Sequence, residues 1–362
     1  MEPSINQRLH DDTLAHKIRL VGHENAVAYH VGALWNDAIQ RAGELVKLRW
    51  KGLGVHNRSG AKELADDIAL LVLANVDNVE RTLRMDLYEQ VQTENRIVRA
   101  MLARDIPSFV WNAVGGMRQL WEDAGVSLTQ AVPEAVAYRL TNSPIAGKTW
   151  AQRLHAIPVN ARRALRTNMA FGIARGESIP QISTRVRNIL GSETKVRSVL
   201  IARTEVHNVS ARVHDRMFGA NTDVLAGVQY LATLDRRTCL ICGSHDREEF
   251  YYKPKAGEMS VAVKPFTPQH PRCRCVYIPL TRFEEMFGTA ITHEKRATMF
   301  GPAKAQSYGQ WLRDRTPEFI EDVLGPARAA LFIRRKYPVD RFVNNGRVRT
   351  LRQLETDTLA QN

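Results

Sequence analysis

The chain has 362 residues, of which 44% are hydrophobic and 25% charged, a composition that excludes a disordered protein and fits two or three folded domains. Its 51 basic and 38 acidic residues give a net charge of +13, which favours an acidic partner, either nucleic acid or an acidic protein surface. Residues 1–20 carry charges without an apolar run, and the longest apolar stretch, residues 68–76, is too short for a bilayer. We therefore expect no secretory signal, no membrane contact and folding in a reducing cytoplasm.

The region from residue 1 to about 140 is predicted to be helical. Apolar residues recur at three- and four-residue spacing from Leu64 to Leu83, and residues 26–46 and 88–102 share this pattern. Glycines between residues 52 and 60 predict a break between two helices. Since no catalytic motif occurs here, we expect a helical bundle or a set of extended helices.

Residues 141–147 form a turn-rich boundary, and three helices are predicted after it. The first covers residues 150–175, the second opens at Ser178 and closes at Gly191, and the third covers residues 193–218. Basic residues strongly outnumber acidic ones in these helices, so one face is a candidate for tracking a phosphate backbone, although a solvated face has the same pattern. The candidate contact residues are Arg162, Arg163, Arg166, Arg185 and Arg187.

Beyond Gly219 the periodicity changes to that of strands. Alternation predicts a strand over residues 228–234, with shorter strands at 250–252 and 276–278. Helices return in the tail, notably at residues 304–313 and 317–324. The predicted fold class is therefore α+β and mainly α: a long helical N-terminal region (residues 1–140), a small α/β module with a short sheet and a Cys/His cluster (141–282), and a helical C-terminal tail (283–362).

All four cysteines of the chain lie in one short stretch, together with a histidine. The two-residue gap between Cys239 and Cys242 is typical of a turn that grips a tetrahedral metal ion. If the segment after Cys273 is extended, Cys273 and Cys275 project to the same face and both can reach that turn. We favour a structural zinc ion bound by Cys239, Cys242 and Cys273, with His270 and Cys275 competing for the fourth position. Disulfides and free thiols remain alternatives.

Polar residues near this cluster are candidates for structural roles. Arg203, Glu205 and Asn208 stand among apolar residues of the third helix, which predicts a partly buried ion pair and a hydrogen-bond hub rather than a general base. Asp235 is expected to belong to the same structural hub region and to cap the turn before Cys239. The alternative pairs Asp235 with His270 in a metal-dependent nuclease, but no second acidic residue or histidine has a spacing that suggests a hydrolytic pair. We predict no catalytic residue.

Several motifs in fixed order carry a resemblance to a known family. The chain resembles the Mu F-like family, the minor head (head morphogenesis) proteins of tailed bacteriophages, from about Pro144 to Leu354. The central motifs are Ala202–Asn208 (ARTEVHN), Gly227–Cys242 and His270–Cys275 (HPRCRC); outside them lie Pro144–Thr149, Arg175–Ile179, Tyr308 with Trp311 and Leu312, Val323–Arg328, and Phe342 with Val343.

The resemblance implies a structural role in the virion. Family members are minor head components associated with the portal vertex, and they assist procapsid assembly and DNA packaging or ejection. The implied partners are the portal protein, the major capsid or scaffolding protein and packaged double-stranded DNA, and the implied location is the interior of the head near the portal. Some relatives carry toxin or transferase domains, whereas the tail after Thr281 matches the ordinary ending. The alternatives are a metal-dependent nuclease and a zinc-containing DNA-binding protein acting on phage DNA.

Overall fold

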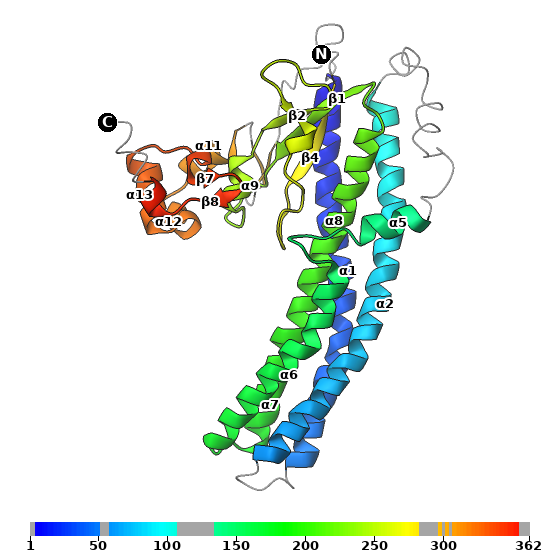
Figure 1. The fold of residues 1–362 in the computed structure, drawn as a ribbon, viewed down its shortest axis with the longest axis vertical. Helices are drawn as coiled ribbons and strands as arrows, with labels where there is room; N and C mark the ends of the chain where they lie inside the picture. The colour runs from blue at the N-terminus through cyan, green and yellow to red at the C-terminus, as the bar shows by residue number, and fades with distance from the viewer. Residues whose placement is uncertain are drawn as a thin grey trace.

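The computed structural model describes residues 4–50, 58–106, 134–281, 296–298, 301–303 and 306–354. Two long helices, α1 (Ile5–Trp50) and α2 (Arg58–Asp105), run side by side along the rod-shaped molecule (Figure 1). The apolar stripe of α2 is buried as its spacing predicts, through Leu64, Ile68, Val72, Val76, Val79 and Leu83. Most of the break expected between the two helices, residues 51–57, lies outside the described residues.

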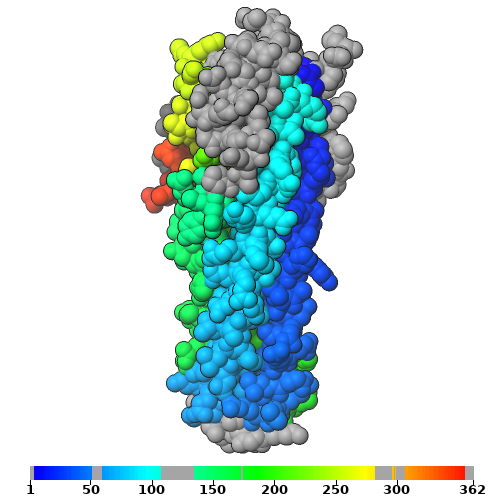
Figure 2. All heavy atoms as spheres, turned by 90° about the vertical axis from the view of Figure 1, so that its right-hand side faces the viewer, coloured from blue at the N-terminus to red at the C-terminus, as the bar shows by residue number. Residues whose placement is uncertain are grey.

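Three further helices complete the rod. After the short helix α5 (Glu134–Thr141), α6 (Trp150–Ala174) packs on α2, while α7 (Ile179–Leu190) and α8 (Arg197–Gly219) pack on α1. The space-filling view shows α1 and α2 along one side of the rod (Figure 2). Apolar residues from α1, α2, α5, α6, α7 and α8 share one hydrophobic core.

The α-helix α7 ends at Leu190 with Gly191 as its C-cap residue, as expected, but the chain does not leave the helical path there. Gly191 has right-handed helical angles (φ −52°, ψ −47°), and the chain passes through a π-helical segment, η1 (Gly191–Val196), directly into α8. A π turn disturbs the regular pairing of backbone carbonyls, and side-chain hydroxyls satisfy two of them here. Thr194 Oγ1 donates to the Leu190 carbonyl at 2.5 Å and Ser192 Oγ to the Ile189 carbonyl at 3.0 Å. Glycine directs the chain out of a helix when it adopts a positive φ, which Gly191 does not.

A four-stranded mixed sheet lies at one end of the rod, with strand order β3-β2-β1-β4 (Figure 1). The central strand β1 (Leu225–Leu231) is buried throughout and pairs antiparallel with β2 (Glu249–Tyr251) and β4 (Val276–Thr281), while β3 (Met259–Ser260) runs parallel to β2. All three predicted strands are present with shifted bounds. The short helices α9 (Leu240–Ser244) and η2 (Val261–Val263) lie in the loops between strands.

The beginning of α1 covers the sheet. Asn6 Oδ1 accepts hydrogen bonds from the backbone nitrogen and the hydroxyl of Thr281, each at 3.0 Å, and Leu14 packs against Leu231 and Ile278. A single hydrophobic core extends from Ile5 to Tyr277. The helices before residue 140 and the module after it are therefore packed together, and a domain division at residue 140 remains a prediction.

The C-terminal part forms a compact unit beside the sheet with its own core around Trp311, Phe332 and Phe342 (Figure 1). The helix expected from residue 304 begins at Tyr308, after the N-cap Ser307, and residues 304 and 305 lie outside the described residues. Besides its helices, this unit contains two hairpins that were not predicted. The structure as a whole is mainly helical with a four-stranded mixed sheet, so the predicted α+β, mainly α class is confirmed. The elements of the C-terminal unit are β5 (Arg296–Thr298), β6 (Gly301–Ala303), α11 (Tyr308–Arg313), α12 (Pro317–Leu324), α13 (Pro326–Arg334), η3 (Asp340–Phe342), β7 (Val343–Asn344) and β8 (Arg347–Val348).

Candidate metal centre

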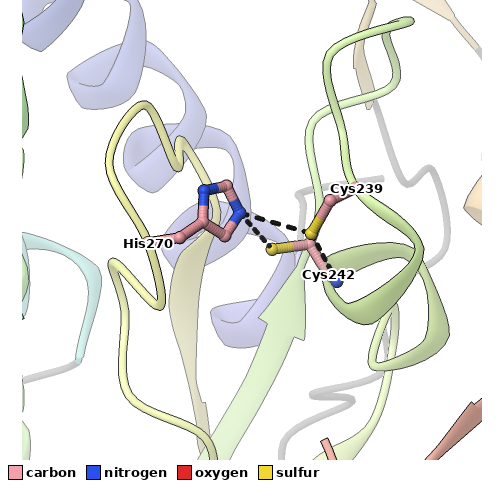
Figure 3. Close-up of side chains that lie close together, drawn as sticks. All are labelled: Cys239, Cys242 and His270. Carbon is pink, nitrogen blue, oxygen red and sulfur yellow. Dashed lines mark hydrogen bonds between the residues drawn. The ribbon is translucent and has the colours of Figure 1, made fainter. Parts of the chain in front are cut away.

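The first pair of cysteines is positioned by the start of α9. Cys239 is the N-cap residue of this helix, and its Sγ accepts a hydrogen bond from the Cys242 backbone nitrogen at 3.4 Å. A helical first turn places residues three apart on the same side. Both sulfurs therefore face the loop that carries His270 (Figure 3).

Three pairs of these sulfur and nitrogen atoms lie at separations that ligands of one small ion have. His270 Nε2 lies 3.3 Å from Cys239 Sγ and 3.4 Å from Cys242 Sγ, and Cys242 Sγ lies 3.8 Å from Cys273 Sγ (Figure 3). Four ligands at zinc distances on a tetrahedron are separated by roughly 3.3–3.8 Å. The atoms form two groups, Cys239–Cys242–His270 and Cys242–Cys273–Cys275, in each of which all ligand atoms lie within 4.8 Å. Cys242 is common to both groups.

Protons are unevenly shared among these residues. The hydrogen bond with Cys242 lowers the pKa of Cys239 to about 4, and His270 supports this effect. In turn, the Cys239 sulfur raises the pKa of His270 to about 9. The pKa of Cys273 is also lowered, first by its hydrogen bond with Cys242, whereas those of Cys242 and Cys275 are raised. The cluster therefore contains thiolates next to groups that keep their protons. A divalent cation can take the place of these protons, because thiolate and neutral imidazole are the forms that bind metal.

A surrounding layer of hydrogen bonds orients the cluster. The Nδ1 atom of His270 lies 2.8 Å from the Pro271 carbonyl, so it carries the proton and leaves Nε2 directed at the sulfurs. His207 Nε2 lies 3.0 Å from the carbonyl of Cys275 and holds the backbone just before β4. Sequence reasoning missed His207, because its partner is 68 residues away and no local pattern marks the contact.

Asp235 ties the two halves of the cluster together. Its Oδ1 accepts a hydrogen bond from the Arg237 backbone nitrogen at 2.8 Å, which is the capping geometry expected before Cys239, and its Oδ2 forms an ion pair with Arg274. Asp235 belongs to none of the ligand groups found among the described residues. The geometry therefore offers no support for a nuclease that uses Asp235 and His270 as joint metal ligands.

The hub predicted on α8 contains Glu205 and Asn208 but excludes Arg203. Asn208 Nδ2 donates to Glu205 Oε2 at 2.9 Å and to the Ser143 carbonyl at 3.1 Å, and both side chains are buried. Arg203 is exposed, so the expected buried ion pair is wrong. Residues two apart on a helix do not face each other, which explains the separation. Burial raises the pKa of Glu205 to about 7.

Glu205→Gln is expected to increase stability at high pH. Between about pH 4.5 and 7 the folded state binds more protons than the unfolded state, so the free energy of unfolding falls as pH rises, and it levels off above pH 7. A neutral glutamine removes this loss and should gain about 2 kcal/mol at pH 8 but little at pH 4. Urea unfolding at both pH values checks this, with exposed Glu89→Gln as control. An equal effect of Glu205→Gln at both pH values would refute it.

The five predicted contact arginines have different surroundings. Arg162 Nε and Arg166 Nε lie 2.9 and 2.8 Å from Asp66 Oδ1 on α2, and their hydrogen bonds hold the pKa of Asp66 well below its usual range. Arg185 Nε donates to Glu177 Oε2 at 2.9 Å. Arg187 is half-buried beside Gly43, whereas Arg163 is exposed. Three of these arginines are therefore ion-paired within the chain, two of them to the same carboxylate, and Arg163 is exposed without an ion pair to the described residues.

A further contact missed from the sequence joins the C-terminal unit to the cluster. The Asp246 carboxylate accepts from the backbone nitrogens of Ala232 and Tyr308 and from Arg296 Nη2 at 2.7–2.8 Å. The Tyr308 ring lies over Gly243, where an added Cβ would be 2.4 Å from the ring. The CxxC turn is therefore packed between the sheet and the C-terminal unit.

Comparison with known proteins identifies one family. Residues 163–278 match the model of the family described as Phage Mu protein F like protein, so the predicted Mu F-like resemblance is confirmed over this segment. The family is one of phage head morphogenesis proteins. The motifs beyond residue 278, including Tyr308 and Trp311, lie outside the matched segment. No curated protein and no solved structure showed a significant match. Among the described helices, none has the length and apolarity needed to cross a bilayer.

Proposed function

We propose that this protein is a non-enzymatic minor head protein of a tailed phage, located inside the head at the portal vertex, where it assists procapsid assembly and DNA packaging or ejection. The observation that carries the proposal is the family match over residues 163–278, because it spans both the basic helices and the Cys/His sheet. The proposed partners are the portal protein, the major capsid or scaffolding protein and packaged double-stranded DNA.

The Cys/His cluster is proposed to hold a structural zinc ion through Cys239, Cys242, His270 and Cys273. Three of the separations among these four atoms, 3.3, 3.4 and 3.8 Å, support this set, and a prearranged His270 tautomer supports it further. Cys273 joins Cys239 and His270 through Cys242, which belongs to both groups of mutually close ligand atoms. Cys275 is then a buried neighbour whose backbone carbonyl is held by His207. Four protein ligands close the coordination shell, which agrees with a site that pins two loops and binds no substrate.

The surface proposed to meet the portal or the packaged DNA is the exposed face of α6 around Arg163. An exposed arginine at the edge of an interface contributes mainly through long-range charge attraction, which salt weakens. The ion-paired Arg162 and Arg166 have a different role, since they join α6 to α2 through Asp66. Reversing their charge would perturb the bundle itself, so Arg163 is the residue to test.

Arg163→Glu is expected to weaken co-purification with the portal ring at low ionic strength by roughly threefold or more, while incorporation remains detectable at high protein concentration. Arg334→Glu makes the same charge change at an exposed position of α13 and serves as the matched control. Mass spectrometry and immunogold labelling of purified procapsids and mature heads test the location. Absence of the protein from both particles would refute the proposed function, and equal retention of the two variants would refute the contact surface.

A further inference from the structure

A second group of metal-ligating side chains lies inside the helical rod, separate from the cysteines. His16 of α1, Glu94 of α2 and His214 of α8 place their Nε2, carboxylate oxygen and Nε2 atoms within 4.8 Å of one another. Each residue is at least nine-tenths buried. The three helices pack against one another at this level, so one small cluster collects a side chain from each of them.

The hydrogen bonds of this cluster are incomplete. His214 Nε2 lies 3.1 Å from Glu94 Oε2 and is hydrogen-bonded to it. His16 Nε2 lies 2.9 Å from the same oxygen, yet neither ring nitrogen of His16 finds a hydrogen-bond partner among the described residues. A close approach without a hydrogen bond means that the nitrogen points beside the oxygen rather than at it. Ligands of a shared ion have this geometry, because each lone pair points at the ion between them.

The charges of the cluster also favour a cation. The neighbouring Lys17 forms an ion pair with Glu24, whose Oε1 lies 3.5 Å from Lys17 Nζ. Glu94 instead contacts the two histidines, His16 and His214. With neutral rings, Glu94 is a buried carboxylate without a counter-charge, which is costly. A single protonated ring, that of His214, balances Glu94 but leaves both ring nitrogens of His16 without a hydrogen bond. With two protonated rings, positive charges stack at 5.3 Å between ring centroids. A divalent cation balances the carboxylate while both imidazoles stay neutral.

We infer that His16, Glu94 and His214 form a second binding site for a divalent transition-metal ion of the zinc class. Two imidazoles and one carboxylate are a common ligand set for such an ion, and they leave a fourth position open. A cavity of about 30 Å³ lined by His16 and His214 adjoins the cluster and has room for one water molecule as the fourth ligand. Bound there, the ion clamps α1, α2 and α8 together below the sheet.

Cobalt substitution of the full-length, untagged protein tests this inference. We expect about two Co²⁺ ions per chain, one with the intense near-ultraviolet band of thiolate ligation and one without it. His214→Gln should remove the ion that lacks the thiolate band and leave the other. His155→Gln, which changes an exposed histidine on α6, should retain both ions. Two ions in the wild-type protein and one in His214→Gln would support the inference.

The outcomes also separate this site from the cysteine cluster. Binding of a single ion that Cys242→Ser abolishes would overturn the second site and leave the first in place. An ion without the thiolate band, alone, would overturn the cysteine site and support this one. If His214→Gln does not fold, Glu94→Asp should weaken binding of the ion without the thiolate band by about tenfold, since a shorter carboxylate misplaces the ligand. If Glu94→Asp binds the ion without the thiolate band as tightly as the wild-type protein does, the assignment of Glu94 as a ligand is refuted.

Discussion

Cys242→Ser is expected to release the zinc ion proposed for the cysteine cluster, so that the metal content falls by about one ion per chain, and to lower the thermal midpoint on the order of 10 °C. Cys242 belongs to both groups of sulfur and nitrogen ligands, and its Sγ lies within 3.8 Å of His270 Nε2 and of Cys273 Sγ. Its loss therefore removes the central ligand in either arrangement. Losing a structural metal costs several kcal/mol, and each kcal/mol shifts the midpoint of a protein of this size by a few degrees. Elemental analysis and differential scanning calorimetry measure the two effects.

Two further variants, Cys275→Ser and His270→Asn, identify the fourth ligand. Cys275→Ser should retain zinc, because Cys275 lies outside the proposed ligand set, whereas His270→Asn should lose it. His245→Asn is the matched control, since His245 follows the CxxC turn but is held by Glu248 at 2.6 Å. An unchanged zinc content together with an unchanged thermal midpoint in Cys242→Ser would refute the cysteine site, because any zinc at the second site does not depend on Cys242. Zinc loss in Cys275→Ser but not in His270→Asn would show that Cys275, and not His270, is the fourth ligand.

Gly227→Ala is expected to destabilise the protein by about 3 kcal/mol or more. A Cβ at Gly227 would lie 2.2 Å from the backbone oxygen of Phe250 in the neighbouring strand. Backbone cannot yield as a flexible side chain does, so β1 and β2 must separate or the sheet must shift. Since β1 is paired on both sides, either movement also disturbs β4.

The free energy of unfolding, measured with urea, checks this prediction. Gly22→Ala on α1 is the control, because an added Cβ there meets nothing within 4 Å. That substitution should raise stability by up to about 1 kcal/mol through helix propensity. Equal stabilities of Gly227→Ala and Gly22→Ala would show that the close approach of the two strands does not constrain this position.

Local patterns in the sequence predicted the helices well. The α12 helix matches residues 317–324 as expected, and Ser178 precedes α7 as its capping residue. These elements depend on neighbouring residues: an apolar repeat, a cap and a proline near the first turn. The same reasoning did not predict the π-helical segment η1, which continues the helical path from Gly191 into α8 and contacts α1 and α6.

The candidate site was predicted as a set of residues but not as an arrangement. Cysteine spacing indicated the ligands, because a CxxC turn and a strand with alternate cysteines have local geometries. It did not reveal His207 behind Cys275, nor that Arg162 and Arg166 meet Asp66, about 100 residues away. Such partners depend on which helices pack together, and a single sequence contains no local signal for that choice. The buried His16, Glu94 and His214 were hidden for the same reason.

The contact between Asn6 and Thr281 has a consequence for synthesis on the ribosome. The two residues are separated by 275 positions, so α1 is synthesised well before β4, the strand that it contacts. During that interval α1 has no strand to cover, and its apolar residues Leu14 and Leu20 are exposed to other nascent chains. Pairings so distant along the polypeptide form slowly and leave intermediates prone to aggregate. Yield should therefore depend on slow translation and on chaperones that shield the emerging N-terminus.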